Sequence, residues 1–197
     1  MGSAAISGPS IEPLWTRPSR GRVGMASLIV AESAIFTIFV VAYIFYIGKS
    51  LSGPTPAVLT VPIFATICLL SSSVTMHLAV RALRNAKVGS FGFWWFLTLS
   101  LGAIFLIATG LEWHKLVFHD GLTISTNLFG TTYYSLVGLH AFHVTVGLIG
   151  LVIVMAFTLL GKMTSKYTER VDVFSLYWHF VDAVWVVVFT VVYVIGR

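Results

Sequence analysis

Five apolar stretches, each long enough to cross a lipid bilayer, determine what this 197-residue chain can fold into. A hydrocarbon core about 30 Å thick is crossed by about 20 residues of α-helix. The stretches cover residues 24–47, 57–83, 91–111, 129–160 and 173–195. Because the segments between them are too short to fold alone, the sequence predicts an all-α fold, a single integral membrane bundle of five transmembrane helices over residues 24–197.

The composition agrees with a membrane protein. Hydrophobic residues make up 57% of the chain and charged residues 10%, whereas soluble domains have about 25% charged residues. Residues 1–23, which contain Pro9, Pro13 and Pro18, are expected to form a tail that is disordered or ordered on contact. The stretch 24–47 is longer than the apolar core of a signal peptide, so it is expected to remain as the first span.

Positive charges lie mainly on one side of the predicted bundle. Nine of the twelve Lys and Arg residues do so, namely Arg17, Arg20, Arg22, Arg81, Arg84, Lys87, Lys162, Lys166 and Arg170. Positive residues in short loops stay on the cytoplasmic side, so the N-terminus is predicted to be cytoplasmic and the C-terminus outside. The net charge of +5 is explained by attraction of these basic residues to an acidic lipid surface. No nucleic-acid partner is expected.

Motifs that would support catalysis by this chain alone are not found in the sequence. It has no Gly-rich phosphate loop, no CxxCH haem attachment and no GxSxG nucleophile motif. Cys68 is the single cysteine, which excludes an internal disulfide. We therefore expect no catalytic centre within the chain.

Two histidines lie three residues apart in the fourth stretch. His140, His143, Gly147 and Gly150 step by three and four, which places them on one stripe of a helix. The glycines are expected to let another helix come close, and the histidines to face that same helix. Interhelical hydrogen bonding and a chemical role both remain open for the two histidines.

Polar residues also form stripes in two other stretches. Asp172, His179 and Asp182 share one face of the fifth, and Ser73, His77, Arg81 and Arg84 share one face of the second. A sharper alternative is a metal site, because such sites are built from ligands of these types. Its four candidate ligands are His140, His143, His179 and Asp182.

Four further polar residues have simpler interpretations. Glu32 lies inside the first stretch with no basic residue nearby in sequence, so it needs a partner on another helix or a proton of its own. Glu112 is read as an interfacial anchor beside Trp113. Asp172 is read as a solvated or capping residue before the fifth helix, and His77 as a residue at the level of the lipid headgroups.

The sequence resembles a known family in several places. "YYSLVGLHAFHVTVGLIGL" at 133–151 and "LYWHFVDAVWVVVFTVVYVIG" at 176–196 are similar to the signature of subunit III of the haem-copper terminal oxidases, in its bacterial five-helix form. "VAESAIFTIFVVAY", "ICLLSSSVTMHLAV", "LGAIFLIATGLEW" and "TSKY" agree with it in order. The resemblance covers residues 24–197.

The resemblance implies an accessory subunit of a cytochrome c oxidase in the bacterial cytoplasmic membrane. Haem and copper are expected in partner subunits, chiefly the catalytic subunit I, and none in this chain. The family is thought to sustain proton uptake and to protect the catalytic centre. It is also thought to hold phospholipid in a cleft between the first two helices and the others. A place in a respiratory supercomplex is left open.

The resemblance also implies roles for individual residues. Glu32 matches the intramembrane carboxylate of the family, and His143 matches the histidine that approaches that carboxylate and the lipid. Structural polar roles are expected for His140, His179 and Asp182.

The chain also departs from the family pattern. Thr109 stands where relatives often carry Gln, and Asp172 where they carry Glu. A lipid-binding Arg of some relatives has no counterpart within 154–160. Two alternatives stay open: subunit III of a quinol oxidase or nitric oxide reductase, and a small proton-conducting transporter.

Overall fold

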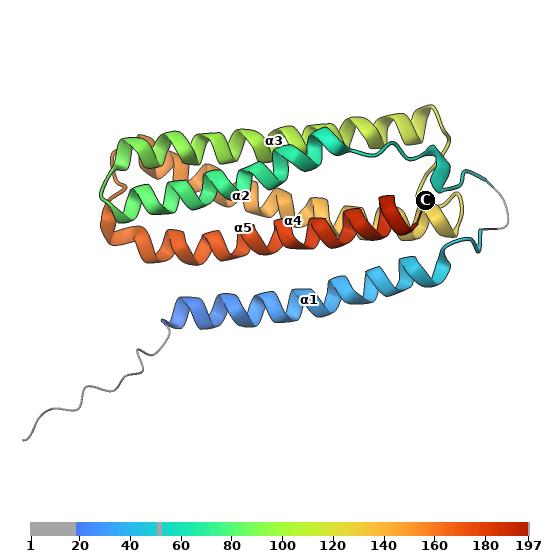
Figure 1. Cartoon of the computed structure of the whole chain (residues 1–197), viewed down its shortest axis with the longest axis horizontal. Helices are drawn as coiled ribbons and strands as arrows, with labels where there is room; N and C mark the ends of the chain where they lie inside the picture. The colour runs from blue at the N-terminus through green and yellow to red at the C-terminus, as the bar shows by residue number, and fades with distance from the viewer. Residues whose placement is uncertain (1–18, 51–52, 197) are drawn as a thin grey trace, which may run out of the picture.

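A computed structural model describes residues 19–50 and 53–196, and within these ranges it shows five long helices and no strand. All five are long and apolar enough to span a membrane, which confirms the predicted fold class. The helices run antiparallel in succession (Figure 1). They are α1 (Arg20–Tyr46), α2 (Ile63–Arg84), α3 (Val88–Phe118), α4 (Leu128–Leu159) and α5 (Thr168–Phe189).

Three short helices complete the part of the chain that the structure describes. They are η1 (Pro56–Val58), η2 (Ser165–Tyr167) and the π-helical η3 (Thr190–Ile195). The last of these follows α5 without a break, so the predicted fifth span is one continuous helix that changes from α-helical to π-helical geometry near its end. After this wider turn, Gly196 lies close to the Tyr43 hydroxyl. A Cβ added at Gly196 would be only 2.7 Å from that oxygen.

The first two helices begin at residues other than those expected. The backbone N–H of Arg22 donates to Ser19 Oγ at 3.4 Å, and this cap starts α1 four residues before Gly24. The proposed tail therefore ends before Arg20, and residues 1–18 lie outside the described residues. Helix α2 starts six residues later than expected, at Ile63, because Pro62 precedes it and proline cannot sit inside a helix.

Helix α3 is longer than its apolar stretch. It continues seven residues past Leu111 and ends at Phe118, so the predicted link at 112–128 is shorter than expected. Glu112 is therefore a helical residue one to two turns from the end of α3. A helix need not end where the hydrocarbon ends, and the apolar pattern alone does not mark its last turn.

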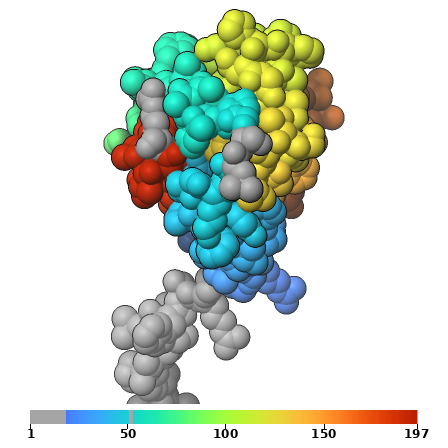
Figure 2. All heavy atoms as spheres, turned by 90° about the vertical axis from the view of Figure 1, so that its right-hand side faces the viewer, coloured from blue at the N-terminus to red at the C-terminus, as the bar shows by residue number. Residues whose placement is uncertain are grey.

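Helices α2 and α3 contact each other more extensively than any other pair, which confirms the predicted hairpin. Helix α5 packs against α2 and α4, while α1 lies at the side of the bundle against α4 and α5 (Figure 1). Viewed from the end where the C-terminus lies, the end of α1 sits at the edge of the molecule (Figure 2).

This arrangement corrects one expectation. The resemblance implied a cleft between the first two helices and the others, but α1 makes few contacts with α2, and α2 is packed tightly on α3 and α5. Helix α1 lies at the side of the bundle and packs against α4 and α5. Any groove of that kind therefore lies along α1 alone.

The glycines of α4 allow α5 to approach closely, as predicted. A Cβ on Gly147 would lie 2.7 Å from the ring of Trp178, and one on Gly150 would lie 2.4 Å from the ring of Phe174. Three tryptophans, Trp95, Trp178 and Trp185, are almost completely buried in the core beside them. Close backbone approach and large aromatic side chains thus hold α3, α4 and α5 together.

The basic residues gather at one end of the bundle. The start of α1, the α2–α3 link and the α4–α5 link all lie at the left of Figure 1. Eight of the nine basic residues assigned to one side lie there, and the ninth, Arg17, falls outside the described residues. We call this the basic end, and its location in the cytoplasm stays a prediction.

Candidate functional site

The structure brings Glu32 of α1 and His143 of α4 together. Glu32 Oε2 lies 3.2 Å from His143 Nε2, across a sequence separation of 111 residues. Glu32 is twelve residues along α1, so it lies about 18 Å from the start of that helix, near mid-span. Its side chain is 22% exposed and that of His143 is 8% exposed. The partner that Glu32 needs is thus supplied by α4.

A second contact fixes the proton on the other ring nitrogen. His143 Nδ1 lies 2.8 Å from the backbone carbonyl oxygen of Leu139, which can only accept, so Nδ1 carries the hydrogen. Nε2 then either accepts a proton from a neutral Glu32 or donates one to its carboxylate. Either way, one proton lies between the two groups. The arrangement can store a proton without leaving a charge unpaired.

Two aromatic rings contact the imidazole of His143, the buried Phe36 and the exposed Phe142. The ring of Phe36 lies 5.1 Å from that of His143, and the ring of Phe142 lies 5.6 Å from it. The hydroxyl of Tyr177 donates to the backbone oxygen of His143 at 3.0 Å. These contacts hold the imidazole in one orientation, and the buried Phe36 covers one side of it.

His140 lies in different surroundings, which corrects the expectation that both histidines face one helix. Its ring packs 4.9 Å from Trp185 of α5 and 5.7 Å from Phe105 of α3. It is 1% exposed, and among the described residues neither ring nitrogen has a hydrogen-bond partner. Residues three apart lie about 60° from each other around a helix, and the two rings therefore reach different neighbouring helices.

His179 and Asp182 of α5 share a hydrogen-bond partner on α2. Ser73 Oγ lies 2.8 Å from His179 Nδ1 and also donates to Asp182 Oδ2, so one hydroxyl joins both α5 residues to α2. The four residues considered as metal ligands are thus divided among three places. Within residues 19–50 and 53–196, no group of three or more His, Cys, Asp or Glu side chains could hold a metal ion.

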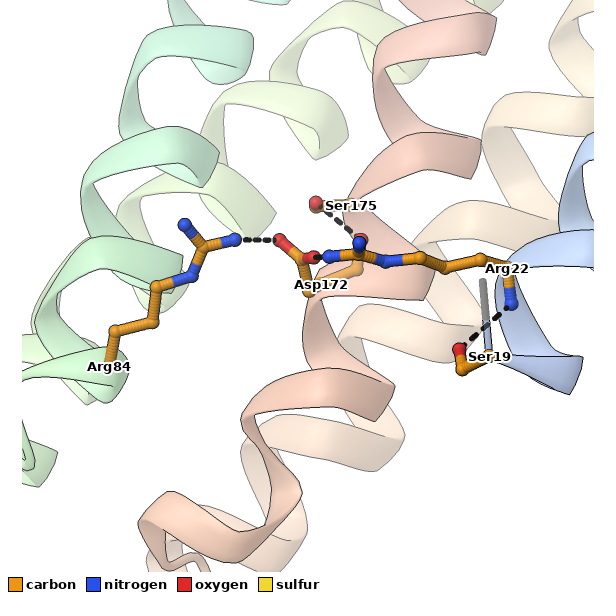
Figure 3. A network of polar contacts seen from close by, with 5 residues as sticks. All are labelled: Ser19, Arg22, Arg84, Asp172 and Ser175. Carbon is orange, nitrogen blue, oxygen red and sulfur yellow. Dashed lines mark hydrogen bonds and ion pairs between the residues drawn. The ribbon is translucent and has the colours of Figure 1, made fainter. Parts of the chain in front are cut away.

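Asp172 connects three helices and is neither a helix cap nor a freely solvated group. Its two carboxylate oxygens accept from Arg22 of α1 and Arg84 of α2, each at 2.5 Å (Figure 3). The Asp172 side chain is 15% exposed, and both arginines are about half exposed. Ser175 Oγ donates to the backbone oxygen of Asp172 at 2.7 Å. The expectation of a solvated or capping Asp172 was wrong.

His77 lies near this ion-pair network. Its side chain is exposed, and it lines a recess together with Arg81 and His179. The predicted stripe on α2 is confirmed, because all four of its residues lie on the side of α2 that faces α5. Ser73 contacts α5 directly, and His77, Arg81 and Arg84 line the recess between the two helices.

A group of tyrosines near the other end of the bundle was missed by the sequence interpretation. Tyr193 Oη lies 3.5 Å from Glu112 Oε1 and 3.5 Å from Tyr133 Oη, and both tyrosines are buried. Glu112 is therefore joined to η3 and α4 and is more than an interfacial anchor. The tyrosines stood in apolar stretches, where they read as ordinary core or belt residues.

Comparison with known proteins agrees with this fold. The family model described as cytochrome c oxidase subunit III matches residues 19–197. The chain is 33% identical to a probable cytochrome c oxidase subunit 3 of Nocardia farcinica, over 90% of this chain and 89% of that protein. It is also 32% identical to the cytochrome c oxidase subunit 3 of Corynebacterium diphtheriae, over 99% and 98% of the two chains. The chain therefore belongs to the cytochrome c oxidase subunit III family.

Proposed function

We propose that this chain sustains proton uptake and working lifetime in the catalytic subunit of a bacterial cytochrome c oxidase. As a subunit III, it is an accessory member of a multi-subunit haem-copper oxidase. Haem and copper belong, in this proposal, to subunit I and other partner subunits. The observation that carries the proposal is the contact of 3.2 Å between Glu32 Oε2 and His143 Nε2, near the middle of α1.

A groove beside this pair supports a bound phospholipid. It lies between α1 and α5 and has a volume of about 200 Å³. It is lined by Ser33, Phe36, Thr37, Val40, Val184, Val187 and Val188. Apart from two small hydroxyl residues the walls are apolar, as an acyl chain requires, and Ser33 is the residue next to Glu32. We propose that an acyl chain in this groove keeps water from the outer side of the pair.

The charge distribution supports a location and an orientation. The relatives named above come from bacteria, and we propose the bacterial inner membrane for this chain. The basic end would face the cytoplasm, as positively charged loops do. Proton uptake from the cytoplasm would then start at the end where Arg22 and Arg84 hold Asp172.

Two variants of the assembled oxidase test the proposal, Glu32→Gln and His143→Ala. We expect haem content and the initial rate of oxygen consumption to be close to those of the unaltered complex. The number of turnovers before inactivation should fall several-fold, and mass spectrometry of the intact complex should show fewer phospholipids bound.

Glu112→Gln is the matched control, because it also alters a half-buried carboxyl but lies far from His143 in the fold. It should leave lifetime and lipid content unchanged. If Glu32→Gln and His143→Ala retain both lifetime and lipid, the proposal is wrong. Proton flux through the chain reconstituted alone, lost in Glu32→Gln, would instead favour a transporter.

A further inference from the structure

A polar recess opens between α2 and α5 at the basic end, and neither Glu32 nor His143 lines it. Its volume is about 310 Å³. It is lined by His77, Val80, Arg81, Arg84, Asp172, Ser175 and His179. Figure 3 shows one wall of it, where Arg84 reaches Asp172 from α2. A cavity of this size holds a phosphate group together with a small part of whatever carries it.

The charges around the recess are unbalanced. Arg22 and Arg84 both pair with Asp172, so two guanidinium groups already face one carboxylate. Arg81 adds a third, and it makes no hydrogen bond or ion pair with any residue that the structure describes. Arg22 does not line the recess, so within its lining two arginines, Arg81 and Arg84, face one carboxylate, Asp172. The lining therefore carries an excess of one positive charge, which favours a bound anion.

The donors at the recess suit a phosphate in particular. A guanidinium group presents its N–H groups in a planar fork that matches two phosphate oxygens, and Arg84 uses only its Nη2 for Asp172. His77 is exposed and adds a ring N–H, while Val80 provides an apolar wall. Basic pockets between transmembrane helices near the cytoplasmic surface are typical sites for phosphorylated lipid headgroups.

We propose that the recess between α2 and α5 binds a phosphate group, with Arg81 and the free edge of Arg84 as the main donors and His77 as an additional one. The phosphate can belong to the headgroup of an anionic phospholipid or to soluble phosphate. The chemistry of recognition is the same for both. This site is separate from the groove along α1 and does not depend on the function proposed for Glu32 and His143.

Site-specific modification of arginine tests the proposal in the assembled oxidase. The complex is placed in nanodiscs of phosphatidylcholine, with or without phosphatidylglycerol, and treated with phenylglyoxal. Mass spectrometry of the peptides then compares Arg81 with Arg20, which is exposed at the same end but does not line the recess. A phosphate contact worth about 1 kcal/mol at Arg81, which Arg20 lacks, would slow the modification of Arg81 about fivefold relative to Arg20.

A second arm identifies the source of the phosphate. Inorganic phosphate is added to phosphatidylcholine nanodiscs at constant ionic strength, with chloride as the reference. Protection of Arg81 by phosphatidylglycerol alone identifies a lipid headgroup, and protection by inorganic phosphate identifies a soluble anion. Both results support a phosphate site.

His77→Ala should reduce the protection of Arg81 at least twofold, because it removes one donor and leaves Arg81 in place. The matched control is His114→Ala, an exposed histidine near the other end of α3, which should leave the protection unchanged. The proposal is overturned if Arg81 and Arg20 keep the same relative rate in all conditions. It is also overturned if Arg81 is equally protected in every condition, phosphatidylcholine alone included, and stays equally protected in His77→Ala, since another subunit then covers it.

Discussion

His143 and His140 lie three residues apart on α4, yet the structure gives them opposite surroundings. His143 has a hydrogen-bond partner on each ring nitrogen, Glu32 on one side and the Leu139 carbonyl on the other. His140 has aromatic rings on its faces and no described partner for either nitrogen. One histidine can therefore exchange a proton with a neighbour, while the other fills space.

The difference arises from the packing of the other helices. Helix α1 lies beside α4 at His143 and brings a carboxyl group, whereas α5 lies beside α4 at His140 and brings Trp185. Gly147 and Gly150 then bring α5 even closer in the following turns. A charged imidazolium could not be stabilised at His140, because charge in an apolar site without a partner is very costly.

Removing the aromatic cover of His140 should have the largest effect. Trp185 is 1% exposed, packs on the rings of His140 and Phe105, and donates from Nε1 to Thr66 Oγ1 at 3.1 Å. We expect Trp185→Ala to lower the free energy of unfolding by about 3–5 kcal/mol, the usual cost of such a cavity. Titration with a denaturing detergent, followed by circular dichroism, would measure it.

Phe96→Ala is the matched control, because its ring is exposed on α3 and faces away from the core. That variant should unfold within about 0.5 kcal/mol of the unaltered protein. A loss of less than about 1 kcal/mol in Trp185→Ala would mean that His140 does not depend on this ring.

Removing His143 should have the second largest effect. In His143→Ala, Glu32 loses its partner in a partly buried position, at an expected cost of about 1–3 kcal/mol. Thermal loss of subunit III from the complex would report it. A double-mutant cycle with Glu32→Gln makes the test specific, because groups in contact are expected to show a coupling of about 0.5–3 kcal/mol. A coupling near zero would contradict the contact.

The sequence predicted the broad fold for a clear physical reason. A bilayer leaves few alternatives to helices of fixed length, so the five spans, the α2–α3 hairpin and the role of the α4 glycines could all be anticipated. The starts of α1 and α2 depended on a serine cap and on Pro62, which apolar length does not reveal.

The side-chain sites were harder to predict. Asp172 pairs with Arg22 across 150 residues of sequence. That pairing depends on α1 packing against α5, which no local pattern shows. One signal was present, because Arg22, Arg84 and Asp172 were all assigned to the same side of the membrane. The different neighbours of His140 and His143 could not be predicted, since they depend on where α1 and α5 cross α4.

A smaller effect is expected at Tyr177, which supports His143 from behind. Tyr177→Phe removes the hydroxyl that donates to the His143 carbonyl at 3.0 Å, at a cost of about 0.5–1.5 kcal/mol. Because Glu32 stays in place, lipid content and turnover lifetime should change much less than in His143→Ala. Tyr46→Phe, an exposed position near the end of α1, is the control. An effect as large as that of His143→Ala would show that the orientation of the imidazole depends on Tyr177.

The smallest effect is expected at His140 itself. His140→Leu keeps an apolar side chain between Trp185 and Phe105 and removes two ring nitrogens that lack described partners. Replacing an unsatisfied buried polar group by an apolar one of similar size is nearly neutral or stabilising, so we expect a change between zero and a gain of about 1 kcal/mol. Denaturing-detergent titration measures it, with His140→Ala as the comparison that leaves a cavity. A loss of more than about 1 kcal/mol in His140→Leu would mean that an ordered water bonds to the ring, and His140 would then resemble His143 in having a polar partner.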